Sequence, residues 1–407
     1  MALLNKATVV RVGKSAASIT TFLFVVLVSG CAPLPEESPD PACEVKDIER
    51  APDGLVVWSP TGELYIINRK DDAGIYQLYV GTASDMNPVC ITCTERLNSP
   101  APNRQKLQPH WHPSGQWIVL AGERENYTKP WLATPELIEG WVQSGLWVNI
   151  YITRPDGSEW YQLSDFGHGQ GDGFTGVAFT PDGTQAVWAQ IVSGNIFEAM
   201  FGRWELILAD FQEDGGGVPS FTNLRDITPV GAKWVEPGNF APDGKSLLIT
   251  ADIGLSDAQG MDQFILDITT GEVRNLTNSP DVWDEHGVFS NDGKKILFMS
   301  SYPFRTNWLS HTVLSLKTEF MLMNSDGSGL QQLTHFNSPG YPESNAPGRG
   351  SVAAIGEWNP DGRTISALNL FFPNYETWTI PFNDNCGGDA RSQPERSPAF
   401  YPNKIIR

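Results

Sequence analysis

The feature that most constrains the fold is a hairpin signature that recurs along the chain. One copy, NFAPDGKSLLI (239–249), has an aromatic residue, a Pro-Asp-Gly turn and a run with alternating apolar residues. Proline presets φ at the first central turn position, and Asp and Gly favour the tight reversal that follows. The alternation indicates a strand with one buried face. The other copies are VWSPTGELYII (57–67), HWHPSGQWIVL (110–120), AFTPDGTQAVW (178–188), VFSNDGKKILF (288–298) and EWNPDGRTISA (357–367).

The six copies share one register and predict a ring of sheets. Their aromatic residues are Trp58, Trp111, Phe179, Phe240, Phe289 and Trp358. Each copy is followed by a second strand pair, such as TEFMLMNSDGSGLQQLTH (318–335). A four-stranded unit of this size cannot bury both faces alone, but sheets stacked around an axis cover one another. We therefore predict an all-β, six-bladed propeller of four-stranded antiparallel blades, with the aromatic residues between neighbouring sheets.

These motifs resemble the TolB-type, WD40-like (PD40) propeller repeat, which joins an aromatic-Ser-Pro-Asp-Gly turn to a later Asp-Gly and Leu-Thr. NSDGSGLQQLT (324–334) and TGEVRNLT (270–277) match it closely. The turns WSPTG and HPSG depart from it by lacking the Asp, and FSND lacks the Pro. The resemblance implies a propeller over residues 43–390.

Both ends of this region bear on how the ring closes. CEVKDIER (43–50) is similar to the last strand of a blade, so we expect it to complete the blade that begins at Trp358. PAFYPNKII (398–406), in a C-terminal tail at 391–407, is similar to the first half of another motif. Seven blades are thus the alternative to the six that we favour.

The N-terminal region reads as an export signal. Basic residues precede an apolar stretch at 15–28, which is short for a membrane span of about 20 residues. LVSGC (27–31) resembles the lipobox of bacterial lipoproteins, which implies cleavage of a signal peptide (1–30) and acylation of Cys31. Ala32 then implies the outer membrane by the same resemblance, with the side of that membrane left open. A membrane anchor or an ordinary cleaved signal is the alternative. Residues 31–42 would form a Pro-rich acidic tether.

The cysteine count agrees with export. Of five cysteines, assigning Cys31 to lipid leaves four that an oxidising compartment would pair. We expect a local bridge between Cys90 and Cys93 in VCITCTE, although CxxC also suits redox chemistry or half a zinc site. Cys43 and Cys386 then pair, which predicts Cα atoms within about 7 Å across the two ends of the domain.

Charge and motif content exclude several classes of function. The net charge of −19 argues against nucleic acid as a partner, because phosphate binding needs surplus Lys and Arg. Gly-x-Ser-x-Gly, Walker and Rossmann motifs are absent from the sequence. We assign no catalytic residue and no resident cofactor.

Propellers bind ligands at the central channel mouth, so the residues just before each aromatic are the binding candidates. They are His110, Glu236, Asp284, Glu285, His286 and Glu357. Carboxylates and imidazoles that converge on an axis could hold a divalent cation or a cationic partner segment. The alternative is that each is an ordinary solvated or hydrogen-bonded residue.

A second candidate surface is the insertion YTKPWLATPELIEGWVQSGLW (127–147). Residues 135–145 predict a short helix, with Thr134 as its cap and Pro135 opening it. Trp131, Trp141 and Trp147 would form a docking surface, since tryptophan is favoured at interface hot spots. The alternative is a lid that packs on its own blade.

Two functions remain. The TolB resemblance implies a monomeric envelope lipoprotein that binds a protein or peptide partner and reaches the membrane only through its lipid. The alternative is a metal-dependent lyase on acidic sugars, similar to oligogalacturonate lyases, with His110, His168 and His286 as contributors. The candidates include acids and almost no bases, and this disfavours an acidic substrate.

Overall fold

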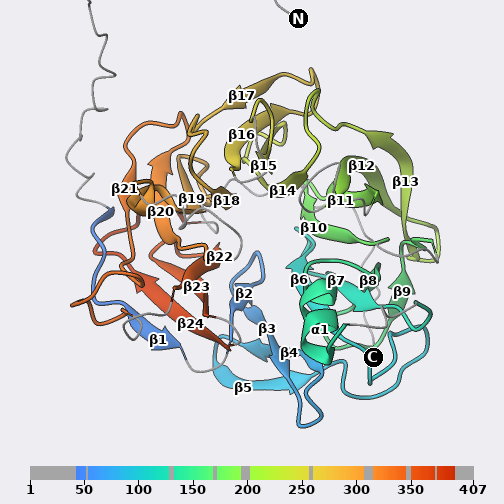
Figure 1. Ribbon diagram of the computed structural model, residues 1–407. Coiled ribbons are helices and arrows are strands. Elements are labelled where there is room, and N and C mark those ends of the chain that lie inside the picture. Colours follow the sequence, from blue (N-terminus) through green and yellow to red (C-terminus); the bar gives the residue numbers. More distant parts are fainter. Residues whose placement is uncertain are drawn as a thin grey trace, which may run out of the picture. The chain divides into compact units, whose positions relative to one another are not determined.

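The computed structural model describes residues 43–51, 54–127, 133–167, 172–193, 202–255, 260–306, 315–344, 350–371 and 374–389. The predicted signal peptide, Cys31, the tether and the C-terminal tail lie outside these residues. The described strands form six four-stranded antiparallel sheets. Figure 1 shows them arranged as the blades of a ring. The prediction of a six-bladed propeller is confirmed, and the seven-bladed alternative is not.

The blades follow chain order, and each runs from the axis outward. Blade 1 contains β2 (Val56–Trp58), β3 (Leu64–Lys70), β4 (Tyr76–Thr82) and β5 (Asp85–Cys90). Blade 2 contains β6 (Lys106–Trp111), β7 (Ile118–Glu123), β8 (Val148–Thr153) and β9 (Trp160–Gln162). Blade 3 contains β10 (Phe174–Phe179), β11 (Gln185–Ser193), β12 (Arg203–Glu213) and β13 (Pro219–Asp226).

The other three blades repeat this plan. Blade 4 contains β14 (Val235–Phe240), β15 (Ser246–Ala251), β16 (Asp262–Asp267) and β17 (Val273–Asn275). Blade 5 contains β18 (Asp284–Phe289), β19 (Lys295–Ser300), β20 (Glu319–Asn324) and β21 (Gln331–Gln332), with a 3₁₀ turn at Tyr302–Phe304. Blade 6 contains β22 (Val352–Trp358), β23 (Thr364–Phe371), β24 (Asn374–Pro381) and β1 (Glu49–Ala51).

The hairpin turns share one geometry. The turn glycine has φ between 65° and 74° in all six copies, a conformation that glycine adopts without a Cβ clash. The residue before it accepts a backbone N–H from two residues on, as Asp243 does from Lys245 at 2.8 Å. In the two copies without Asp, the hydroxyls of Thr61 and Ser114 accept the same bond. The departures from the motif therefore preserve its hydrogen bond.

The later Leu-Thr motif fixes the fourth strand to the third. The Thr334 hydroxyl accepts the backbone N–H of Phe320 at 3.0 Å, inside blade 5. Equivalent hydroxyls accept a third-strand N–H in four other blades, and they belong to Thr92, Ser164, Thr228 and Thr277. Because each bond is largely shielded from water, each motif hydroxyl satisfies a backbone donor at the blade edge.

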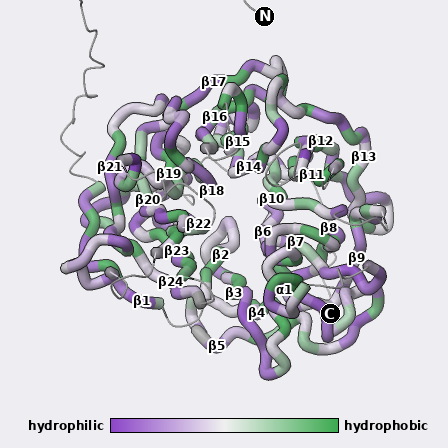
Figure 2. The backbone as a smooth tube through the Cα atoms, viewed as in Figure 1, coloured by the Kyte–Doolittle hydropathy of each residue, from purple (hydrophilic) through white to green (hydrophobic). Residues whose placement is uncertain are grey.

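The aromatic residues join neighbouring blades, as predicted. The Trp111 indole of blade 2 donates to the carbonyl of Val57 in blade 1 at 3.0 Å. Phe289 of blade 5 belongs to a buried cluster that contains Leu248 of blade 4. Trp358 likewise shares a buried cluster with blade 5. In Figure 2 the hydrophobic segments lie within the blades, while hydrophilic segments prevail along the outer loops.

The ring closes because a strand from the N-terminal end of the domain pairs with a strand from its C-terminal end. β1 pairs with β24, so the N-terminal segment supplies the outer strand of blade 6, as predicted. The Cys43–Cys386 disulfide is present beside this pairing, with its Cα atoms 5.0 Å apart. The two ends of the domain are therefore clasped both covalently and by a sheet.

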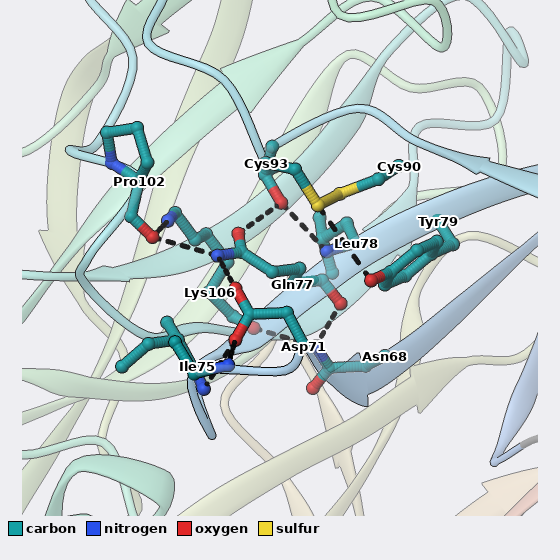
Figure 3. Close-up of a disulfide and its surroundings, with 12 residues drawn as sticks. Asn68, Asp71, Ile75, Gln77, Leu78, Tyr79, Cys90, Cys93, Pro102 and Lys106 are labelled. Atoms are coloured by element: carbon teal, nitrogen blue, oxygen red, sulfur yellow. Dashed lines mark hydrogen bonds between the residues drawn. A yellow bond between two sulfur atoms is a disulfide. The ribbon is translucent and has the colours of Figure 1, made fainter.

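The Cys90–Cys93 disulfide is also present, and it lies beside a polar network between blades 1 and 2 (Figure 3). The Gln77 amide donates to Asp71 at 2.9 Å and to the carbonyl of Pro102 at 2.8 Å. The fully buried Lys106 ammonium also donates to that carbonyl, and burial lowers the pKa of Lys106 to about 8. These bonds tie the two blades together where their backbone groups would otherwise be unpaired.

The predicted helix in the insertion is confirmed as α1 (Pro135–Gln143), in which Pro135 takes the first turn and Thr134 accepts the N–H of Leu137. In the part of the chain that the structure describes, every helix is too short or too polar to cross a membrane.

Candidate binding site at the ring axis

The innermost strands carry a recurring irregularity that shapes the axis of the ring. β6, β10, β14, β18 and β22 each have a register shift within the five residues that lead to the motif aromatic. The residue three positions before the aromatic has a left-handed φ in three blades, at Gln108 (49°), Gly176 (57°) and His286 (53°). A bulge of this kind re-aims the neighbouring side chains, so the strict alternation of a strand fails here.

Three of the predicted candidates converge at this level. Glu236 from β14 and His286 from β18 face each other, with Oε2 and Nε2 3.4 Å apart. One ligand atom from each of Glu236, Glu285 and His286 lies within 4.8 Å of the others. We call these residues the axial triad. Two blades contribute to it, so its geometry depends on how the blades pack.

Each member of the axial triad is oriented by a hydrogen bond from outside the triad. The Thr175 hydroxyl donates to Glu236 Oε1 at 2.9 Å. The Trp283 indole donates to Glu285 Oε2 at 2.8 Å. His286 Nδ1 lies 3.0 Å from the carbonyl of Ala354 and therefore carries the proton that it donates there. Each of the three residues therefore has one further polar side-chain atom that is free of these bonds and can face the space enclosed by the triad.

Burial and mutual charge set the protonation of the axial triad. Burial would lower the pKa of His286, but Glu285 and Glu236 outweigh it and raise the pKa to about 9. Burial likewise opposes ionisation of Glu236, but His286 and Thr175 hold the pKa of that carboxyl below its ordinary value. Burial raises the pKa of Glu285, and repulsion from Glu236 adds to this effect. The triad therefore favours a positive charge close to its carboxylates.

The remaining axial candidates take other positions. His110 lies near enough to Glu236 to feel its charge, yet burial dominates and lowers the pKa of His110 to about 4. Burial alone raises the pKa of Glu357 to about 7. Asp284 is 2% exposed and accepts hydrogen bonds from Ser279 and Ser300, so the structure does not bring it into the triad.

The tryptophan surface does not form as the sequence suggested. Trp147 is 2% exposed and stacks on Tyr127 with ring centroids 4.6 Å apart. Trp141 is half-buried and meets Trp147 edge-on. Trp131 lies outside the described residues. The insertion packs against blades 2 and 3, because the Trp147 N–H donates to the carbonyl of Asp172 and Trp147 shares a buried cluster with Val148 and Phe174, so Trp147 is not available to a partner.

Several residues that shape the site were not among the sequence candidates. Thr175 and Trp283 orient the carboxylates, and Gln108 links the axis to the end of α1 by donating to the carbonyl of Gln143 at 3.0 Å. Thr175 and Gln108 precede their aromatics by four and three residues, as Glu236 and His286 do. Comparing those positions across all copies would have found them.

The chain is similar to several solved structures. TolB from Acinetobacter baumannii matches with a TM-score of 0.47 at 15% identity, over 81% of this chain and 66% of that one. Putative TolB from Agrobacterium tumefaciens matches with 0.43 at 18% identity, over 70% and 85%. An oligogalacturonate lyase in complex with manganese matches with 0.46 at 11% identity, over 84% and 99%. No family model and no curated protein matches the chain. At these identities the likeness concerns the fold alone.

Proposed function

We propose that this protein is a lipid-anchored scaffold of the bacterial cell envelope, whose propeller binds a partner that presents positive charge to the ring axis. The observation that supports this proposal most directly is the axial triad, in which two carboxylates lie beside one imidazole. The four residues before each motif aromatic include no Lys or Arg. Such an axis attracts a cationic segment and repels an acidic one.

Sequence and disulfides support the envelope location. Cys31 follows a basic and apolar leader, and residues 32–42 would hold the propeller away from the bilayer. Two disulfides suit an oxidising compartment. Since one acyl chain anchors a protein only weakly, firm attachment at Cys31 requires more than one chain.

Fractionation of a bacterial host tests the anchor. The wild-type protein should sediment with outer membranes, and Cys31→Ser should release it from them. Ala32→Asp, which keeps the cysteine, should move the protein to the inner membrane. Sedimentation of Cys31→Ser with the membranes would count against the lipid anchor.

Crosslinking in the intact envelope tests the binding role. Partners captured by the wild-type protein should be lost in Glu236→Gln and in Glu285→Gln. The exposed carboxylate of Glu272, far out on a hairpin of blade 4, offers a matched control, and Glu272→Gln should keep them. Equal capture by all three variants would place the binding surface away from the axis.

A metal-dependent lyase on acidic sugars is the second candidate, because the axial triad has the donor types of a metal site. An acidic sugar would also need basic residues near the axis to pair with its carboxylates. Turnover of a polyuronate by the purified protein, abolished in His286→Asn, would favour the enzyme.

A further inference from the structure

We propose that Glu236, Glu285 and His286 bind one divalent transition-metal ion at the ring axis. This inference goes beyond the proposed function, which needs no metal. Two carboxylates and one neutral imidazole supply two negative charges for a divalent ion. Imidazole as a ligand favours zinc and its neighbours over calcium and magnesium, which prefer oxygen ligands alone.

The backbone of β18 explains how adjacent residues can share one ion. In a regular strand, Glu285 and His286 would point to opposite faces. The register of β18 against β19 shifts between Glu285 and Val288, and His286 takes a left-handed φ of 53°. This turn brings both side chains to the space that Glu236 reaches from β14.

The distances suit a small ion after slight adjustment. Ligand atoms around a tetrahedral zinc ion lie about 3.3 Å apart, given metal–ligand bonds of about 2.0–2.2 Å. Glu236 Oε2 and His286 Nε2 are 3.4 Å apart, and the full set lies within 4.8 Å. Small side-chain rotations would bring the three ligand atoms to this separation and leave a fourth position open.

The surrounding hydrogen bonds are those expected around metal ligands. A ligating histidine usually donates its other ring N–H to a carbonyl or carboxylate, and ligating carboxylates are themselves hydrogen-bonded. His286 donates from Nδ1 to Ala354, which leaves Nε2 to accept a metal. Thr175 and Trp283 each occupy one oxygen of Glu236 or Glu285. Glu285 is only 9% exposed, so its position is well defined by its neighbours.

The same atoms could instead hold a proton on His286 Nε2, as a closed ion pair with Glu236. Metal and proton exclude each other at that nitrogen, so the two arrangements are experimentally distinct. The ion-pair arrangement needs no metal and predicts no saturable binding.

Calorimetric titration with Zn²⁺ alone, on full-length protein purified in detergent and stripped with a chelator, tests the proposal. We expect one Zn²⁺ per chain, with Ca²⁺ and Mg²⁺ binding far more weakly. Glu236→Gln, Glu285→Gln and His286→Asn should each weaken binding at least about tenfold, and Thr175→Val should weaken it about tenfold through the lost orienting bond. Glu272→Gln should leave it unchanged.

Circular dichroism of each variant establishes whether it is folded. If a triad variant does not fold, the effect of Thr175→Val on Zn²⁺ binding still tests the proposal. Absence of saturable binding, or binding that persists in the folded triad variants, would overturn the metal site. Partner capture that still depends on Glu236 would then leave the proposed function standing.

Discussion

The Cys43–Cys386 disulfide should contribute far more to stability than the Cys90–Cys93 disulfide, because they close loops of very different length. Their sequence separations are 343 and 3 residues. In the chain-entropy model, closing the long loop stabilises the folded state by about 6 kcal/mol, and closing the short one by about 1.6 kcal/mol. The expected difference of about 4 kcal/mol is large beside a typical unfolding free energy of about 5–15 kcal/mol.

Urea unfolding of two double variants measures this difference. Cys43→Ser/Cys386→Ser should lower the unfolding midpoint by up to about 2 M, and Cys90→Ser/Cys93→Ser by much less. Both variants remove two cysteines and one bridge, so each serves as the control for the other.

The remaining closure contacts predict how the first variant opens. β1 still pairs with β24, and Thr377 still donates to the carbonyl of Ala51 at 2.7 Å. The ring should therefore stay closed at rest but open locally at blade 6, with faster amide exchange in β1 and unchanged exchange in β15. Equal destabilisation by the two double variants would refute the account of the Cys43–Cys386 bridge as a ring clasp.

Three further predictions concern the blades. Thr334→Val removes the acceptor for the Phe320 N–H in a buried setting and should cost about 1–3 kcal/mol in urea unfolding; a loss below about 0.5 kcal/mol would contradict it. Gly244→Ala should cost about 1–2 kcal/mol, because φ is +71° and its nearest neighbour is at an ordinary contact distance of 3.7 Å. Burial lowers the pKa of His112 by more than the hydrogen bond to the Gly183 carbonyl raises it. As the pH falls, His112 therefore takes up a proton in the unfolded chain before it does so in the folded protein. The stability of the wild type relative to His112→Gln should therefore fall as the pH drops below about 6.5, as thermal unfolding of both proteins would measure.

The axial triad shows where reasoning from sequence reached its limit. The register of the aromatics placed Glu236, Asp284, Glu285, His286 and Glu357 near the axis. It could not separate Asp284, which turns toward Ser279 and Ser300, from its two neighbours. A single bulge changes which side each residue faces, and neither the alternation nor the turn motif encodes that bulge.

The tryptophan insertion shows the same limit at a larger scale. Thr134 and Pro135 predicted the start of α1 correctly, because a cap depends on atoms one turn apart. The burial of Trp147 depends instead on Tyr127, twenty positions earlier in the chain, and on the backbone of Asp172 at the start of blade 3. The contact with Asp172 exists only once blades 2 and 3 have packed.

The sequence by itself determined the repeated blade unit and the chemistry of its turns, and it favoured six blades over seven. These features rest on interactions between residues close together in the chain, or on a pattern repeated often enough to define a register. Only the tertiary structure decided which side chains meet at the axis and that Trp147 is buried. Those meetings join separate blades, so they depend on bulges and on ring closure, which no local signal in the chain specifies.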